Sequence, residues 1–244
     1  MGTLKWKDDR GRPTAWGEFG MELIESTDLE SVPVFPLPDF VLFPNTLVPF
    51  HIFEPRYVQM MEECLAGGRK VVITGLLPGW ETDYYGTPPI HRTGCVGKVV
   101  NEERLDDGRL NIYVHGLARV TVGGSIQSRP YRMAPARVMG DLMTDSRELQ
   151  RDRELRLRRV SHELIQLLGQ GGEPLAKLLS NTDNLGPLTY RLASLIVSDP
   201  AERQLLLETR TPSARADRLV ESFAHIILQL AGSGKRGDAG YTRH

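Results

Sequence analysis

His162 and Glu163 are the neighbouring residues whose types best fit metal chemistry, and they stand among leucines at helical spacing. A zinc site of the H-E-x-x-H kind needs a second histidine four residues after the first, so that both imidazoles project from one helix face. That position is occupied by Gln166. We therefore interpret His162 as a solvated helix residue and expect no metal ion.

Other catalytic patterns are missing from the sequence. No G-x-S-x-G motif marks a nucleophilic serine. The nearest approach to a phosphate-binding loop is the G-S-G-K of residues 232–235, where the spacing is wrong and no Ser or Thr follows the lysine. Acidic pairs such as Glu62-Glu63 are typical of a solvated surface. We expect no catalytic residue and no cofactor, so the chain is predicted not to be an enzyme.

Cysteine content and charge narrow the class further. Cys64 and Cys95 leave room for one disulfide, but not for a disulfide framework or a cysteine-rich zinc module. The 30 basic and 31 acidic residues give a net charge of −1, whereas a nucleic-acid binder usually has a basic excess. No apolar run approaches the roughly 18 residues of a membrane span, and no signal peptide is visible. We expect a cytoplasmic protein without a membrane segment.

Residues 147–159 form the most basic stretch, with six arginines and three acids. Arg151, Arg158 and Arg159 would suit a patch for RNA or an acidic partner. A charged outer helix face with pairs at three- and four-residue spacing explains the same pattern, and we favour that interpretation. Arg153 falls inside the apolar stripe of this helix, so we expect it to snorkel or to pair with a carboxylate.

The elements that position these residues change in kind along the chain. Residues 1–28 are predicted to be a loosely ordered arm, 29–141 a β-rich unit, 142–232 a helical unit and 233–244 a flexible tail. Predicted strands lie at residues 32–35, 46–52, 70–76, 95–102, 109–115, 118–122 and 131–139. Asp107-Gly108 suits a tight hairpin reversal, Pro55 a helix start, and Asp199-Pro200 another helix start with an N-cap acid. Gly232 is expected to end the last helix.

Three segments of the chain together resemble the N-terminal, substrate-binding domain family of Lon proteases. The first has P-L-P at 36–38, V-L-F-P at 41–44 and I-F-E-x-R-Y at 52–57. The second has G-C-V-G-K-V at 94–99 and V-H-G-L-A-R at 114–119, and the third has A-S-L-I at 193–196, L-L-E-T at 206–209 and R-x-x-R-L at 215–219. Neither an ATPase nor a protease motif accompanies them.

The resemblance implies an α+β fold, with an N-terminal β-rich PUA-like pseudo-barrel followed by a C-terminal α-helical bundle. It also implies a non-enzymatic module that binds polypeptide, such as unfolded or damaged protein segments, and that acts as an adaptor in protein quality control. RNA binding is the alternative, because PUA-like folds elsewhere bind RNA. A homo-oligomer formed through the same surface stays open.

Aromatic residues supply the candidate binding surface. The loop of residues 76–90 holds more aromatic character than a connection needs, and long loops of that composition are often binding elements. The other interpretation, which stays open, is that its rings cap the end of the sheet. For the proline-rich ribbon of residues 33–57, core packing is the favoured interpretation. The candidate polypeptide-binding residues are Phe40, Phe43, Trp80, Tyr84 and Tyr85.

Overall fold

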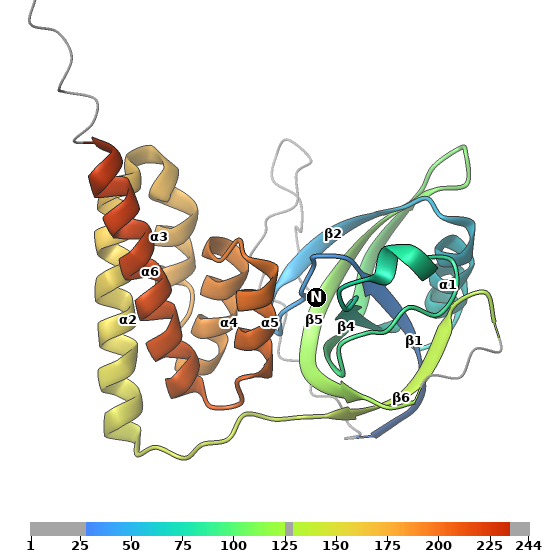
Figure 1. Cartoon of the computed structure of the whole chain (residues 1–244), viewed down its shortest axis with the longest axis horizontal. Helices are drawn as coiled ribbons and strands as arrows, with labels where there is room; N and C mark the ends of the chain where they lie inside the picture. The colour runs from blue at the N-terminus through green and yellow to red at the C-terminus, as the bar shows by residue number, and fades with distance from the viewer. Residues whose placement is uncertain (1–27, 125–128, 235–244) are drawn as a thin grey trace, which may run out of the picture. The chain divides into compact units, whose positions relative to one another are not determined.

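The computed structural model describes residues 28–124 and 129–234, and the chain divides into two compact units between Gly140 and Asp141 (Figure 1). The first unit is a sheet with one α-helix, and the second consists of helices. This order of strands and then helices confirms the α+β class predicted from the sequence. The predicted arm of residues 1–28 and tail of residues 233–244 lie almost wholly outside the described residues.

Six strands build the first unit. Their bounds are β1 (Asp28–Leu37), β2 (Leu47–Ile52), β3 (Lys70–Gly75), β4 (Thr93–Arg104), β5 (Leu110–Val122) and β6 (Arg132–Val138). The sheet order is β2-β5-β4-β3-β1-β6, and β5 also pairs with β6. Strands β1, β3, β4, β5 and β6 therefore close on one another. Of the pairings among described strands, β1 with β3 alone is parallel. This is the predicted pseudo-barrel.

Strand β1 is apolar on both faces because each face meets a different part of the core. Side chains alternate along a strand, so Val34 joins a valine-rich cluster with Val72 of β3. Its neighbour Phe35 points the other way and joins a second cluster with Ile73. The continuous apolar run of residues 32–37 in this strand is thus a consequence of burial on both sides.

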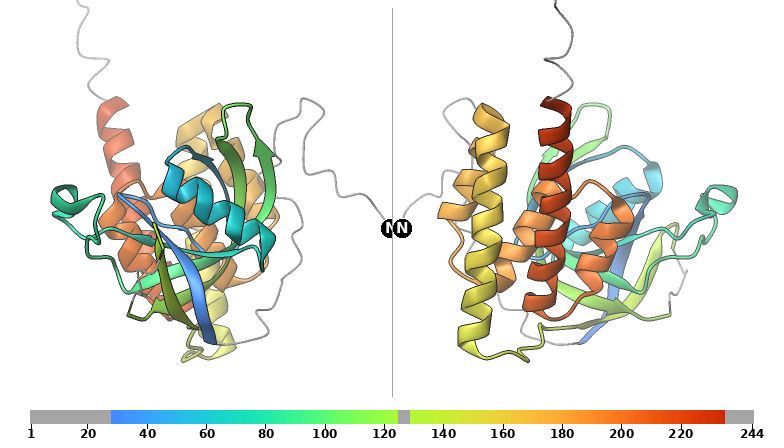
Figure 2. Two further views of the ribbon diagram at one scale, coloured as in Figure 1. Left: turned by 90° about the vertical axis from the view of Figure 1, so that its right-hand side faces the viewer. Right: turned by 60° about the vertical axis from the view of Figure 1, so that its left-hand side comes forward.

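Helix α1 (Pro55–Ala66) covers the second cluster and lies across the sheet (Figure 2). Pro55 occupies the first turn, where its missing N–H costs no hydrogen bond. The side chains at three- and four-residue spacing are buried: Tyr57, Met60, Met61 and Cys64. The ring of Tyr57 packs on that of Phe35 with centroids 4.7 Å apart. The helix start predicted at Pro55 is therefore confirmed, and the helix ends before Gly67.

The β5 strand is continuous where the sequence predicted two strands. Its register against β4 shifts between Val96 and Gly97, opposite Ala118 and Gly116, and such a bulge lets one strand bend without ending. Gly116 is required at the bend, because a Cβ there would lie 2.1 Å from the carbonyl oxygen of Phe43.

The turn that contains Phe43 is fastened to the same glycine. The amide of Asn45 donates to the Gly116 carbonyl, and the Gly116 amide donates to Thr46, both at 2.8 Å. Asn45 has a φ of 61°, a left-handed conformation that asparagine tolerates. Pro44 and Asn45 thus form a turn, and its anchoring brings the Phe43 side chain into the interior with 0% exposure.

Five α-helices form the second unit. Their bounds are α2 (Arg147–Leu168), α3 (Glu173–Ser180), α4 (Leu185–Ile196), α5 (Pro200–Glu208) and α6 (Pro212–Gly234), with the short 3-10 helix η2 (Gly169–Gly172) after α2. The Asp199 carboxylate accepts the amide of Ala201 at 3.2 Å, which confirms the predicted cap.

Helix α6 continues through Gly232 to Gly234, so the predicted end at Gly232 is wrong: one glycine weakens a helix but does not stop it. None of the described helices is long and apolar enough to span a membrane.

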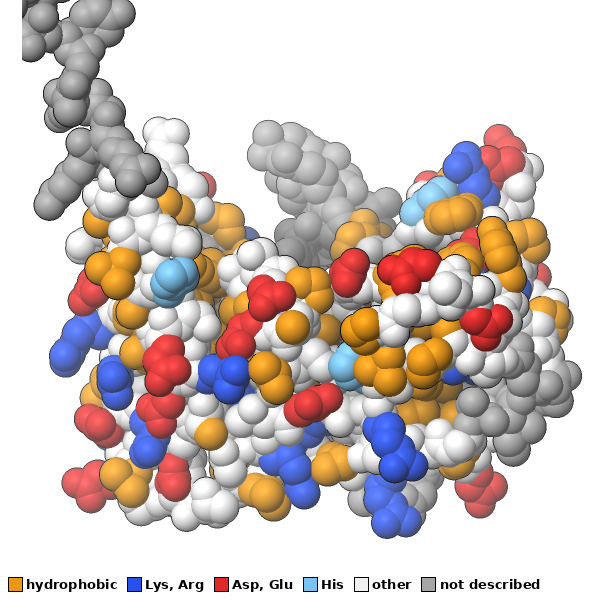
Figure 3. All heavy atoms as spheres, in the orientation of Figure 1, with side chains coloured by type: hydrophobic (Ala, Val, Ile, Leu, Met, Phe, Trp, Pro, Cys, Tyr) orange, Lys and Arg blue, Asp and Glu red, His pale blue; other side chains and the backbone are white. Residues whose placement is uncertain are grey.

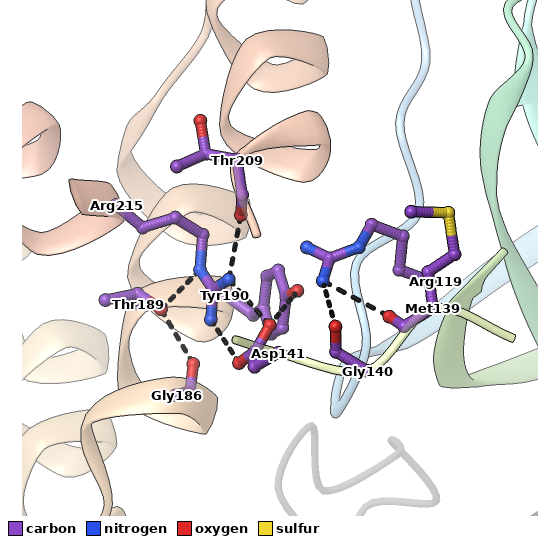
Figure 4. A network of polar contacts seen from close by, with 9 residues as sticks. All are labelled: Arg119, Met139, Gly140, Asp141, Gly186, Thr189, Tyr190, Thr209 and Arg215. Carbon is purple, nitrogen blue, oxygen red and sulfur yellow. Dashed lines mark hydrogen bonds and ion pairs between the residues drawn. The ribbon is translucent and has the colours of Figure 1, made fainter. Parts of the chain in front are cut away.

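Arg215 ties the helical unit together (Figure 4). It is fully buried, and its guanidinium forms two parallel hydrogen bonds with the Asp141 carboxylate at 2.8 and 2.7 Å. It also donates to the Thr209 carbonyl and the Thr189 hydroxyl, each at 2.9 Å. The Tyr190 ring lies 3.9 Å from the guanidinium carbon. One side chain of α6 thus connects α4, the end of α5 and the segment that precedes α2.

Replacing Arg215 with methionine should destabilise the helical unit strongly. Removing one partner of a buried ion pair costs about 3–5 kcal/mol because the other charge stays behind; the Asp141 side chain keeps 18% exposure, so we expect a loss of about 3 kcal/mol in the free energy of unfolding. Urea denaturation followed by circular dichroism measures it. Arg218→Met is the matched control on α6, because its pair with Glu202 is 41% exposed on the arginine side and should be worth less than about 1 kcal/mol. Equal losses in the two variants would contradict the role assigned to Arg215.

Candidate functional site

The aromatic loop between β3 and β4 has a closed base. Leu76 and Ile90 pair as a β-bridge, and the amide of Leu77 donates to the carbonyl of Pro89 at 2.9 Å. Both ends of the loop are therefore extensions of the sheet's hydrogen bonding. The aromatic residues between them project from a fixed stem.

The interior of the loop is ordered by local hydrogen bonds. Gly79, with a φ of 87°, turns the chain into the 3-10 helix η1 (Trp80–Asp83). The Asp83 carbonyl then accepts the amide of Gly86 at 2.9 Å, and its carboxylate accepts the amide of Thr87 at 3.0 Å. An acidic side chain that binds backbone amides in this way fixes a turn without help from the core.

Three of the predicted residues lie together on this loop. The rings of Trp80 and Tyr84 meet edge to face with centroids 5.4 Å apart, and those of Tyr84 and Tyr85 meet at 5.1 Å. Trp80 and Tyr84 are half-buried, whereas Tyr85 is 85% exposed. These contacts give the loop an aromatic surface whose outermost ring is open to solvent.

Arg56, near the start of α1, contacts the rings of the aromatic surface and holds them in position. Its guanidinium carbon lies 4.5 Å from the ring centroid of Tyr57, 4.8 Å from that of Tyr84 and 5.6 Å from that of Tyr85. It donates to the backbone carbonyl of Tyr84 at 3.2 Å and to the carboxylate of Glu54 at 3.1 Å. Glu54 in turn accepts the Tyr84 hydroxyl. Cation–π contacts and charged hydrogen bonds therefore set the position of the rings.

The side chains of Tyr57 and Tyr84 stay neutral across the physiological pH range. Burial raises the pKa of Tyr57 to about 12, against an opposing effect of the Arg56 charge. Burial also raises the pKa of Tyr84, and the hydrogen bond with Glu54 acts in the same direction. Both phenols are thus uncharged hydrogen-bond donors at neutral pH.

Phe40 is connected to Tyr57 by a chain of packed aromatic rings. It meets Phe50 edge to face at 5.3 Å, Phe50 meets Phe35 at 6.0 Å, and Phe35 packs on Tyr57. Phe40 itself is half-buried. Phe43 does not join the group: it is fully buried, because the turn that carries it is fastened to Gly116. A buried ring cannot touch a partner in the folded state, so we remove Phe43 from the candidate surface.

Sequence reasoning missed the arginines of this site. Arg56 appeared there only as a letter of the I-F-E-x-R-Y motif, and Arg132 of β6 did not appear at all. Arg132 is 6% exposed and donates to the carbonyl of Pro88 in the aromatic loop. The order E-x-R before an aromatic residue was the available signal, but only the fold brings the loop over it.

The metal and cysteine expectations concern other parts of the chain. His162 is exposed on α2, and the described residues contain no group of three potential metal ligands. Cys64 and Cys95 are both free and buried. Burial raises the pKa of Cys64 to about 11 and raises that of Cys95 further. Both therefore behave as small apolar side chains.

Arginines of the basic stretch 147–159 take part in contacts within the helical unit. Arg153 pairs with Asp217 of α6 at 3.0 Å, which confirms the expected carboxylate partner. Arg158 pairs with Glu154 and donates to the carbonyls of Leu179 and Thr182. On the face of the helical unit shown in Figure 3, acidic and basic side chains are interspersed.

The fold and the surface define the class of protein: a β-rich unit with a braced aromatic loop, followed by a helical unit. Residues 31–225 match the family described as the ATP-dependent protease La (LON) substrate-binding domain, and the chain belongs to this family. The resemblance noted in the sequence is thereby confirmed.

Relatives and solved structures agree on the domain. The chain is 25% identical over 199 residues to a Lon protease of Desulfosudis oleivorans, covering 80% of this chain and 24% of the relative. It is 29% identical over 215 residues to Lon protease 2 of Sorangium cellulosum, covering 84% and 26%. The chain thus spans about a quarter of the length of the curated relatives it matches.

Two solved structures of Lon N-terminal domains have a similar fold. The N-terminal domain of the Mycobacterium avium complex Lon protease has a TM-score of 0.62 at 15% identity, over 80% of this chain and 98% of that one. A Lon N-terminal domain protein from Xanthomonas campestris has a TM-score of 0.57 at 21% identity, over 79% and 98%. At these identities the likeness establishes the fold.

The buried phenol of Tyr57 predicts a loss of stability in alkali. A tyrosine whose pKa is raised on folding, here from 10.0 to about 12, contributes stability that is complete below pH 10 and is lost as the pH rises through 12. At about 1.4 kcal/mol per pKa unit, that contribution is about 2–3 kcal/mol. We expect the stability difference between wild type and Tyr57→Phe, measured by urea denaturation from pH 7 to pH 11.5, to shift in favour of the variant above pH 10. Parallel pH curves would contradict the assignment.

Proposed function

We propose that the β unit binds extended or unfolded polypeptide segments on the aromatic surface of Trp80, Tyr84 and Tyr85, without catalysing a reaction on them. The observation that carries the proposal is the 85% exposure of Tyr85 on a loop that is otherwise fixed. Tyr85 is grouped with the rings of Tyr84 and Trp80, and aromatic residues are enriched at the centre of protein interfaces. The family description, which names a substrate-binding domain, supports the same role.

The physical basis of binding is burial of a partner's apolar side chains against rings that are already in place. Tyrosine and tryptophan offer large contact areas with few rotatable bonds, so little conformational entropy is lost on binding. Arg56 lowers that cost further, because it holds Tyr84 and Tyr85 by their ring faces. Few polar groups of the surface are left to read sequence, which fits a partner defined by exposed apolar segments.

As an adaptor, such a module delivers its partner to other machinery and needs no active site of its own. Names of the relatives support this direction, since they are proteases that contain a similar segment within a longer chain. A second copy of the chain would satisfy the same aromatic surface. Dissociation of a self-associated species on Tyr85→Ala, seen by light scattering, would therefore redirect the proposal from a foreign polypeptide to a homo-oligomer.

Binding of the purified protein to a reduced, permanently unfolded polypeptide tests the proposal. We expect saturable binding, and about tenfold weaker binding for Trp80→Ala or Tyr85→Ala, because truncation of an aromatic anchor costs about 1–2 kcal/mol or more. Phe53→Ala is the matched control, since this ring is 63% exposed in the same unit and stacks on His51 instead. An unchanged affinity in the loop variants, or an equal loss in Phe53→Ala, would refute the proposed surface. Salt-sensitive binding of a structured RNA in a parallel assay would favour the RNA alternative instead.

A further inference from the structure

A small cavity lies beneath the aromatic loop, and its lining is rich in hydrogen-bond donors. It is lined by residues of β1, α1, the loop and β6, among them Pro36, Arg56, Tyr57, Tyr84, Tyr131 and Arg132. Its volume is about 20 Å³, in a measure by which one water needs about 10–15 Å³. It therefore has room for a group of one or two heavy atoms beyond its mouth, not for a whole side chain.

Arg132 brings to this cavity a buried positive charge that has no ion-pair partner among the described residues. The residue is 94% buried, as its 6% exposure shows, and its hydrogen bond within the described residues goes to the neutral carbonyl of Pro88. No described carboxylate lies within ion-pair distance of Arg132, whereas Arg56 pairs with Glu54. Burial lowers the pKa of Arg132, and the more distant charge of Asp83 opposes this effect without cancelling it.

Three further donor atoms at the same cavity have no acceptor among the described residues. The Tyr57 hydroxyl makes no hydrogen bond to any described residue, and its raised pKa keeps it protonated. Nε and the second terminal nitrogen of Arg132 are likewise without a hydrogen-bond acceptor in the described part of the chain. A buried guanidinium normally finds an acceptor for most of its five N–H groups. The cavity therefore combines excess donors, a cation without an ion pair and a small volume.

We propose that this cavity binds a carboxylate group of the bound polypeptide, held by Arg132 and the Tyr57 hydroxyl. The planar guanidinium matches a carboxylate with parallel hydrogen bonds, and two carboxylate oxygens fill the available space. A phosphate, with four oxygens, is too large for it. The proposal rests on the proposed function, because the loop that binds the polypeptide also roofs the cavity.

The carboxylate has two sources in a polypeptide, the chain terminus and an acidic side chain. Both present the same planar group, and both reach the cavity from the aromatic loop, because Tyr84 belongs to the ring surface and to the cavity lining. A bound segment would thus place its apolar side chains on Trp80 and Tyr85 and its carboxylate beneath them. This arrangement gives the surface a polar specificity that the rings alone lack.

Three versions of one apolar peptide of about ten residues test the proposal in a fluorescence anisotropy assay: one with a free C-terminus and no acids, one amidated, and one amidated with a single glutamate. We expect the free-terminus or the glutamate peptide to bind about tenfold more tightly than the amidated peptide, the gain of a charged hydrogen-bond pair. Whichever of the two binds more tightly identifies the source. This comparison uses the wild-type protein, so it does not depend on the folding of any variant.

Arg132→Gln should abolish the difference among the three peptides. Arg104→Gln is the control for net charge, because Arg104 is an exposed arginine of the same unit, paired with Glu62, and should leave all three affinities unchanged. Equal affinities of the three peptides for the wild type would overturn the carboxylate site and leave the aromatic surface standing. Failure of every peptide to bind would overturn the proposed function as well. Displacement of the preferred peptide by an equal concentration of inorganic phosphate would also overturn the assignment to a carboxylate.

Discussion

A guanidinium that leaves water must find acceptors for its N–H groups and compensation for its charge, and this constraint organises both units of the protein. In the helical unit the constraint is met completely: Arg215 has a carboxylate, a carbonyl, a hydroxyl and a ring face around it. The groups that meet it come from three separate segments, so the packing of those segments against α6 follows from the requirements of a single side chain.

The β unit applies the same constraint with a different outcome. Arg119 is buried and donates to the carbonyls of Met139 and Gly140, where the strand β6 has ended (Figure 4). Arg56 has Glu54 and three aromatic rings, so its charge is matched and its rings are fixed. Arg132 has one hydrogen-bond acceptor among the described residues, the carbonyl of Pro88. Arg56 and Arg119 hold neighbouring segments in place, whereas Arg132 is left with capacity for a ligand.

Local patterns predicted most elements because the local chemistry decides them. The alternation of Leu110, Ile112 and Val114 with polar residues corresponds to alternating burial in β5, and Gly108 adopts the positive φ of 83° that the Asp-Gly turn requires. The local patterns failed where contacts between residues far apart in the sequence determine the structure. Phe43 was a candidate binding residue in the sequence. Its own carbonyl, however, packs against Gly116, which lies far along the chain. The family resemblance covers the segment of Phe43 and the segment of Gly116, but it does not show that the two segments are in contact.

The candidate site shows the same limit more sharply. Aromatic content marked Trp80, Tyr84 and Tyr85 from the sequence, since such residues in a long loop are unusual. Nothing local marks Arg56 and Arg132 as parts of one site, because arginine is common and 30 basic residues are spread along the chain. What distinguishes these two is burial beneath a loop from elsewhere in the sequence, and burial is a property of the fold. An exposed arginine such as Arg104 exchanges one aqueous partner for another at little gain, whereas a buried one confers a strong preference for an anion. The polar part of recognition is therefore expected to reside in Arg132, which the sequence alone does not single out.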